Sequence, residues 1–147
     1  MQKMKIQTLR FGDIDIEENR VFSFEIPIIG FDKLKKFVLL DINKDSFFKW
    51  LQSVEDPALA FPVVSVFSMG MDYSIDLPDS VVENLKISNV ESLLVMNIAS
   101  IPQDNPQGAT INLLAPLVFN LDEQIAGQVI LSGSGYDISF PLFKTQG

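Results

Sequence analysis

The chain has 147 residues, of which 47% are hydrophobic and 12 are phenylalanine, and this composition indicates one packed domain rather than a disordered segment. A formal net charge of −8 argues against nucleic-acid binding, because a protein that holds phosphates needs a basic surface. Histidine and cysteine are absent, which excludes histidine-based catalysis, disulfides and thiolate chemistry, and no apolar run is long enough to cross a membrane or act as a signal peptide, so we expect a cytoplasmic protein.

The first half of the chain predicts short strands joined by turns. Alternation of apolar and polar residues around a Gly12-Asp13 turn predicts a hairpin over 5–17. Further strands are predicted over 22–26, 37–40, 47–54 and 61–67, with single helical turns at 32–36 and 56–57 and a turn at 43–45. The strand over 47–54 carries Trp50, the only tryptophan of the chain.

The second half predicts one helix and the remaining strands. Val81 and Leu85 lie four residues apart on one face of a predicted helix over 78–85. After it come predicted strands over 93–99, 109–120, 125–131 and 136–142, with loops or turns at 101–108, 122–123 and 132–135. About ten short strands with one helix favour a mainly β fold, which we expect to be a small antiparallel β-barrel-like single domain with one or two short helices.

The longest alternation in the chain runs over residues 109–120. Its odd-numbered positions are all apolar: Ala109, Ile111, Leu113, Ala115, Leu117 and Phe119. This pattern predicts one strand with a single face on the core. Pro116 has no amide proton for a ladder, so an edge or a bulge is expected there.

No pattern in the sequence predicts a catalytic, cofactor-binding or metal site. Asp13, Asp15 and Glu17 share one face of the predicted hairpin, but they lack the residue spacing of a calcium loop, so a solvated face is favoured over a partner contact. The glycine-rich turn at 132–135 lacks the lysine of a phosphate loop and precedes no helix.

Several segments in consecutive order resemble the FliW family of bacterial flagellar assembly factors. They are residues 11–14 (Phe-Gly-Asp-Ile), 26–31, 37–40, 50–54 (Trp-Leu-Gln-Ser-Val), 56–61 (Asp-Pro-Ala-Leu-Ala-Phe), 109–113 (Ala-Thr-Ile-Asn-Leu), 115–118 (Ala-Pro-Leu-Val) and 128–131 (Gln-Val-Ile-Leu). Since these stretches span nearly the whole chain, residues 1–147 are expected to form one FliW-like domain. The resemblance implies a small barrel-like β structure, in agreement with the strand pattern.

The resemblance also implies a regulator that acts by binding and not by catalysis. Proteins of this family bind the translational repressor CsrA and also bind flagellin. Flagellin occupies the factor while its subunits accumulate, and after flagellin is exported the freed factor binds CsrA and relieves repression of flagellin mRNA. The expected partners are therefore CsrA and flagellin, with no direct nucleic acid, no membrane and no cofactor. We expect a monomer, because the sequence shows no heptad pattern or long exposed apolar stripe.

The predicted partner-binding residues are Gln52, Ser53, Thr110, Asn112 and Leu114. We place Thr110, Asn112 and Leu114 on the non-core face of the 109–120 strand, and Gln52 and Ser53 belong to the predicted strand over 47–54. Leu114 is apolar at a position where alternation predicts an outward side chain, which suits a docking patch. The alternative is that Leu114 packs under the 101–108 loop.

Two other classes of function stay open. A barrel that carries a small apolar ligand in its lumen would use the aromatic side chains of Phe47, Phe48, Trp50 and Phe67, although aromatic residues on alternating strands are more often core. A hydrolase that works with carboxylates alone is disfavoured by the lack of histidine and cysteine.

Overall fold

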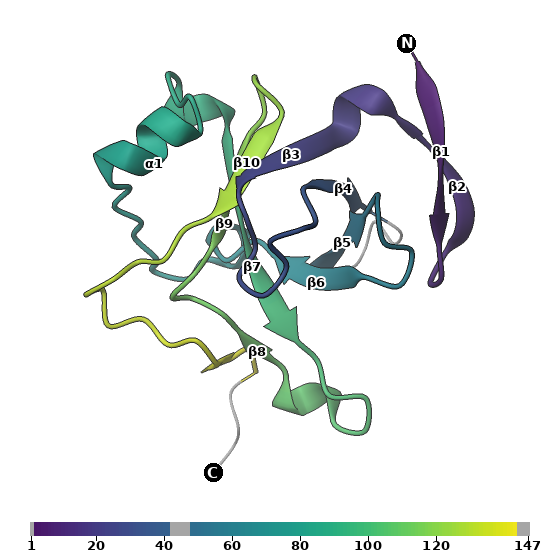
Figure 1. Cartoon of the computed structure of the whole chain (residues 1–147). Helices are drawn as coiled ribbons and strands as arrows, with labels where there is room; N and C mark the ends of the chain where they lie inside the picture. Colours follow the sequence, from purple (N-terminus) through teal and green to yellow (C-terminus); the bar gives the residue numbers. More distant parts are fainter. Residues whose placement is uncertain (1, 42–47, 144–147) are drawn as a thin grey trace.

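The computed structural model describes residues 2–41 and 48–143, and its centre is a closed β-barrel (Figure 1). The barrel strands follow one another around the ring as β7-β6-β5-β4-β3-β10-β9, and β9 pairs back with β7. Their bounds are β3 Val21–Ile26, β4 Lys36–Leu40, β5 Phe48–Ser53, β6 Ala60–Val64, β7 Leu93–Ser100, β9 Leu117–Asn120 and β10 Ile125–Gln128. The mainly β, barrel-like fold that the sequence predicts is confirmed.

Four further strands extend or cover the barrel. β1 (Lys3–Thr8) and β2 (Gly12–Glu17) form the predicted hairpin, in which Ile6 lies opposite Ile14. β8 (Thr110–Ile111) pairs with the end of β7, and β11 (Phe140–Pro141) pairs with β8. The predicted strand over 136–142 therefore shrinks to a two-residue strand.

An aromatic cluster fills the interior of the barrel. The Phe24 ring packs edge-on against the rings of Phe37 and Phe119, with centroids 5.1 and 5.8 Å apart, and all three side chains are buried. Each such contact adds about 0.5–1.5 kcal/mol to the free energy of burying the rings. Gly127 on β10 lets this strand approach β3, because a Cβ at that position would lie 2.7 Å from the Cβ of Ile26.

The hairpin packs against the outside of the barrel. Ile6 and Ile16 are buried against Val38 of β4. At the tip of the hairpin, the guanidinium carbon of Arg10 lies 4.0 Å from the centre of the Trp50 ring, a cation–π arrangement. Trp50 therefore joins the hairpin to β5.

The predicted helix over 78–85 is confirmed as α1 (Asp79–Asn84), with Pro78 at its N-cap position. Single 3-10 turns are η1 (Glu18–Arg20), η2 (Phe67–Met69), η3 (Val90–Ser92) and η4 (Pro106–Gly108). None of the helices in the described part of the chain has the length and apolar character that crossing a membrane requires.

The helical turns predicted at 32–36 and 56–57 are wrong, because both places form hydrogen-bonded turns instead. The amide of Leu34 donates to the carbonyl of Phe31 at 3.1 Å. The carboxylate of Asp56 accepts from the amide of Ala58 at 3.0 Å, and its carbonyl accepts from Leu59 at 3.1 Å. The turn predicted at 43–45 lies outside the described residues.

The single strand predicted over 109–120 is also wrong, because it divides into β8 and β9. Ile111 lies opposite Ala99, and Leu117 lies opposite Met96. Six residues therefore separate the two pairing positions on this segment, whereas only three separate them on β7, so the extra three residues leave the ladder between β8 and β9. The side chain of Asn112 accepts from the amide of Ala115 at 2.9 Å and so closes a turn before Pro116. The odd-numbered apolar side chains are all buried, but Pro116, Val118 and Asn120 are buried as well, so the prediction of a single buried face is wrong over β9.

Candidate functional site

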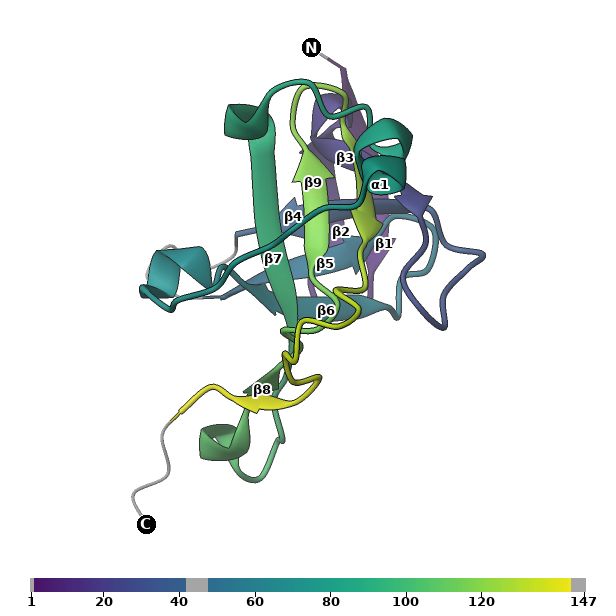
Figure 2. The same cartoon turned by 90° about the vertical axis from the view of Figure 1, so that its left-hand side faces the viewer.

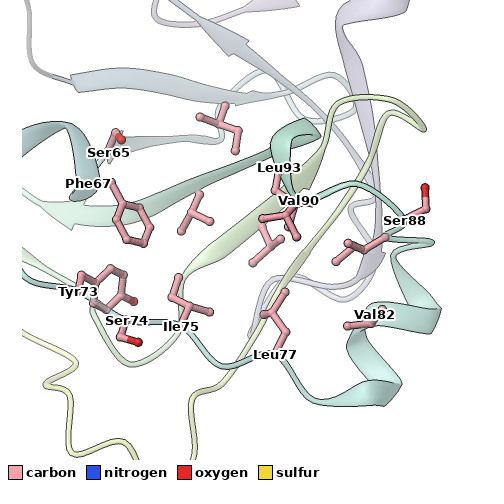
Figure 3. Close-up of a pocket in the computed structure, with 14 residues that line it drawn as sticks. Ser65, Phe67, Tyr73, Ser74, Ile75, Leu77, Val82, Ser88, Val90 and Leu93 are labelled. Atoms are coloured by element: carbon pink, nitrogen blue, oxygen red, sulfur yellow. The ribbon is translucent and has the colours of Figure 1, made fainter.

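A hollow of about 820 Å³ opens on the outer face of the barrel (Figure 3). It lies on the side of α1, which is the side away from the hairpin in Figure 1. It lies between η2, β7, the segment 71–78 and α1, and we name it the β7 groove. Most of its lining is apolar and includes Phe67, Ile75, Leu77, Val90, Leu93 and Val95.

The segment 71–78 forms one wall of the β7 groove. Figure 2 shows the chain between η2 and α1 crossing in front of β7 and β9. The segment is extended but belongs to no sheet, and its side chains alternate: Tyr73 is buried and Ile75 is half-buried, whereas Asp72 and Asp76 are exposed. The alternation that normally makes a strand therefore makes a wall with apolar side chains facing the groove.

A buried polar network holds this wall on the barrel. The Tyr73 hydroxyl donates to the carbonyl of Leu113 and accepts from the side-chain nitrogen of Asn97 at 3.2 Å. Asn97 also donates to the carbonyl of Asn112 at 2.8 Å. The hydroxyl of Tyr136 then accepts from the amide of Ser74 at 2.9 Å. Because three of these four bonds are made from or to residue 73 or 74, the segment is fixed near its middle.

The chemistry of the lining suits apolar binding. Tyr73 is the one titratable residue among those that line the β7 groove. Burial raises the pKa of its hydroxyl, so the side chain is neutral at physiological pH. Phe67 and Val90, on two separate 3-10 turns, keep 48% and 79% of their surface exposed. Large apolar side chains exposed around one hollow mark a surface that binds another molecule.

The stretch of chain that contributes most of the lining of the β7 groove is rich in exposed carboxylates. Between residues 65 and 95 the chain carries five carboxylates and one lysine. These are Asp72, Asp76, Asp79, Glu83, Glu91 and Lys86, and all six are exposed. None of these six charged residues is among those that line the groove.

Two of the residues predicted to bind a partner are in the interior. The expectation that Gln52 and Ser53 face outward is wrong, because both are fully buried. The side-chain nitrogen of Gln52 donates to the carbonyls of Ser53 and Leu59, at 3.0 and 3.1 Å. The Ser53 hydroxyl accepts from the amides of Glu55 and Asp56. Both side chains thus organise the turn between β5 and β6.

The other three predicted partner-binding residues are half-buried. Thr110 lies on β8, whereas Asn112 and Leu114 lie in the turn that separates β8 from β9. Asn112 is engaged in closing that turn, as described above. The five predicted residues therefore do not form one exposed patch, and partner binding by Thr110, Asn112 and Leu114 stays a prediction.

The aromatic residues considered for a ligand in the lumen have other places. Trp50 faces the hairpin under Arg10, and its ring also meets Phe48 edge-on at 5.7 Å. Phe67 lies at the β7 groove, outside the barrel, and Phe47 is outside the described residues. In the described part of the chain, the aromatic cluster packs inside the barrel, where such a ligand would have to lie.

The described residues include no group of three or more acidic side chains placed to hold a metal ion. One carboxylate in the described ranges has a clearly shifted pKa. The amides of Lys36 and Lys35 both donate to Glu55, at 2.9 and 2.7 Å, and they lower the pKa of its carboxyl. Glu55 thereby ties the turn after β5 to the beginning of β4.

Comparison with known proteins gives one consistent family. The profile of the FliW protein family matches residues 5–142. The flagellar assembly factor FliW of Clostridium tetani (strain Massachusetts / E88) is 36% identical, over 97% of this chain and 98% of its own. That of Clostridium novyi (strain NT) is 38% identical, over 96% and 98%. A crystal structure of the flagellar assembly factor FliW aligns with a TM-score of 0.89 and 36% identity, covering 98% of this chain and all of that one.

Proposed function

The chain belongs to the FliW family of flagellar assembly factors, and we propose that it binds and antagonises the translational regulator CsrA and also binds flagellin. In this role it couples the translation of flagellin to the assembly of the flagellum. It works in the cytoplasm by exchanging protein partners, as a chaperone-like regulator and without catalysis of its own.

The proposed exchange follows from mass action. While flagellin accumulates, it occupies the factor and leaves CsrA free to repress flagellin mRNA. Export of flagellin lowers its concentration, so the factor is released and becomes available to CsrA. Each partner then lowers the apparent affinity of the other, which is the reciprocal coupling that linkage requires.

The observation that carries this proposal is the match to flagellar assembly factors along nearly the full length of both chains. The charge gives further support. A protein that holds RNA needs a basic surface, so CsrA is attracted to a chain with a net charge of −8, whereas the phosphates of the RNA are repelled. If raising the salt concentration from low to physiological leaves the rate of CsrA association unchanged, the charge has no part in this recognition.

Calorimetric titration tests the proposal directly. The full chain is titrated with CsrA and, separately, with flagellin of the same organism, and saturable binding to both is expected. A third titration adds CsrA to the chain already saturated with flagellin, where weaker apparent binding is expected. Binding to flagellin alone would reduce the role to that of a flagellin chaperone. Binding to neither would contradict the proposal.

Leu114 provides a test of the surface predicted from the sequence. Replacing Leu114 by Glu adds a charge at a half-buried position in the turn after β8. Loss of partner binding at an unchanged melting temperature would support docking at this turn. A large drop in melting temperature would instead mean that Leu114 is part of the core.

A further inference from the structure

The segment 71–78 is held on the barrel in a different way from the strands around it. Within the described part of the chain, residues 71–77 make no hydrogen bond from backbone to backbone. Gly70, whose φ is 75°, comes directly before the segment, and Pro78 ends it at the N-cap of α1. The segment therefore lies across β7 and β9 without belonging to a ladder (Figure 2).

The backbone of the segment is held by one side chain, that of Tyr136. The Tyr136 hydroxyl accepts from the amide of Ser74 at 2.9 Å and donates to the carbonyl of the same residue at 3.2 Å. The Tyr136 ring also packs edge-on against the Tyr73 ring, with the two centroids 4.9 Å apart. Because Tyr136 lies 62 residues beyond Ser74, the position of the segment depends on a tertiary contact.

The second point of attachment is the hydroxyl of Tyr73, which is bonded to Leu113 and Asn97. Asn97 is fully buried, and its Oδ1 atom has no hydrogen-bond donor among the described residues. If the segment moved away, water would reach this oxygen, and its hydration would offset part of the cost of the lost contacts.

The face beneath the segment is apolar and belongs to the barrel wall. Val118 of β9 is fully buried, and it lies in one cluster with Tyr73, Ile75 and Leu77. β9 is paired with β7 on one side and with β10 on the other, so its place does not depend on the segment. Release of the segment would therefore uncover Val118 without breaking a strand pair.

We propose that the segment 71–78 opens from the barrel as one unit, and that the Tyr136 hydroxyl holds it closed. Opening breaks the bonds of two tyrosine hydroxyls and exposes apolar side chains, but it leaves the barrel ladders intact. It therefore costs less free energy than unfolding of the whole chain. The open state extends the β7 groove to the surface of β9. This inference goes beyond the proposed function, because it concerns the chain without a partner.

Labelling of single thiols tests the opening, because the chain contains no cysteine. Val118→Cys places a thiol beneath the segment. Val63→Cys is the matched control, because Val63 is equally buried but packs in the cluster inside the barrel. Since cysteine and valine are similar in volume, both variants should fold, and their melting temperatures check this.

Each variant is mixed with dithiobis(nitrobenzoic acid) at concentrations where the labelling rate is proportional to the reagent, so that the rate reports the population of the open state. The thiol of Val118→Cys should react about a hundredfold faster than that of Val63→Cys. Its rate should also rise only weakly with urea, because local opening exposes little surface, whereas the rate of Val63→Cys should rise steeply.

Two further substitutions in the Val118→Cys chain test the role of Tyr136. Tyr136→Phe keeps the ring but removes the hydroxyl that binds Ser74, so labelling should become about tenfold faster. Ile6→Val removes one buried methyl group under the hairpin and also lowers global stability. It should leave the labelling rate within about twofold, because the contacts of Ile6 are the same in the closed and open states.

Either of two results would overturn the proposal. The first is labelling of Val118→Cys at the rate of Val63→Cys with the same steep dependence on urea, because Val118 would then be exposed only by global unfolding. The second is an equal effect of Tyr136→Phe and Ile6→Val on the labelling of Val118→Cys. No partner is present in these experiments, so their outcome and that of the calorimetric titrations are independent.

Discussion

The barrel is covered on two sides, and the two covers differ in how completely they bury it (Figure 1). On one side, the hairpin has its own hydrogen-bonded ladder and buries Ile6 and Ile16 against β4. On the other side, the segment 71–78 is extended without a ladder and leaves Phe67 and Val90 exposed. The hairpin, whose two strands hydrogen-bond to each other, buries the side of the barrel that it covers. The segment 71–78, which has no such ladder, leaves apolar side chains on its side accessible to a partner.

The sharpest difference between interior and groove is expected for two phenylalanines. Phe119→Ala removes a buried ring that packs against Phe22 and Phe24, and it should lower the free energy of unfolding by about 3–5 kcal/mol. Phe67→Ala removes a ring that is half exposed and should cost less than about 1 kcal/mol. Denaturant unfolding of both variants measures the difference. Equal costs would mean that Phe67 is part of the core and not of an open surface.

The barrel wall itself is expected to resist a single added methyl group. Gly127→Ala places a Cβ against the side chain of Ile26, where β10 runs parallel to β3. The free energy of unfolding should fall by about 1–3 kcal/mol, since the wall has no room to adjust without moving a strand. A loss below about 0.5 kcal/mol in the same denaturant assay would show that this parallel pairing yields easily.

Removing the Tyr73 hydroxyl tests how the groove wall is held. Tyr73→Phe leaves the carbonyl of Leu113 without its donor and should cost about 1–2 kcal/mol. The wild type should also lose stability above about pH 10. Because the pKa of Tyr73 is raised in the folded state, the unfolded chain loses this proton first as the pH rises. The variant should lose less between pH 9 and 11, and an identical alkaline loss would contradict this role.

The smallest effect is expected at Glu55, near the hairpin side. The amides of Lys36 and Lys35 keep the pKa of this carboxyl below its usual value in the folded state. Its contribution to stability is therefore present at neutral pH and is lost as the pH falls through that lowered pKa. Glu55→Gln should flatten the acid limb of stability between about pH 5 and 3. If the loss of stability between about pH 5 and 3 is the same in the variant, other carboxylates are responsible for it.

The barrel was predictable because alternation is a local signal. The hairpin, the strand after it and α1 all follow from spacing that any window of the sequence contains. The errors arose where one side chain decides between two local structures. Asp56 closes a turn where Asp-Pro also suits a helix start, and Asn112 ends a strand whose apolar alternation continues beyond it.

The candidate site was less predictable than the fold. Alternation shows which residues share a face of a strand, but it does not show which face a following turn covers. Gln52 and Ser53 were therefore predicted to contact a partner, although both are buried under the turn after β5. The β7 groove draws on η2, whose Phe67 was predicted to end a strand, and on residues 71–77 and η3, where no regular element was predicted. The available signal was the short alternation of Tyr73, Ile75 and Leu77 with polar residues. It indicates an extended segment, but it does not predict which part of the fold that segment packs against.

The claim that the open side of the barrel receives protein partners is tested most directly by hydrogen exchange of the full chain, read by mass spectrometry, alone and with saturating CsrA or flagellin. Slower exchange within residues 65–95 on binding at least one of them, with residues 3–17 of the hairpin unchanged, is the predicted result. Slower exchange over the hairpin with none within 65–95 would contradict the claim.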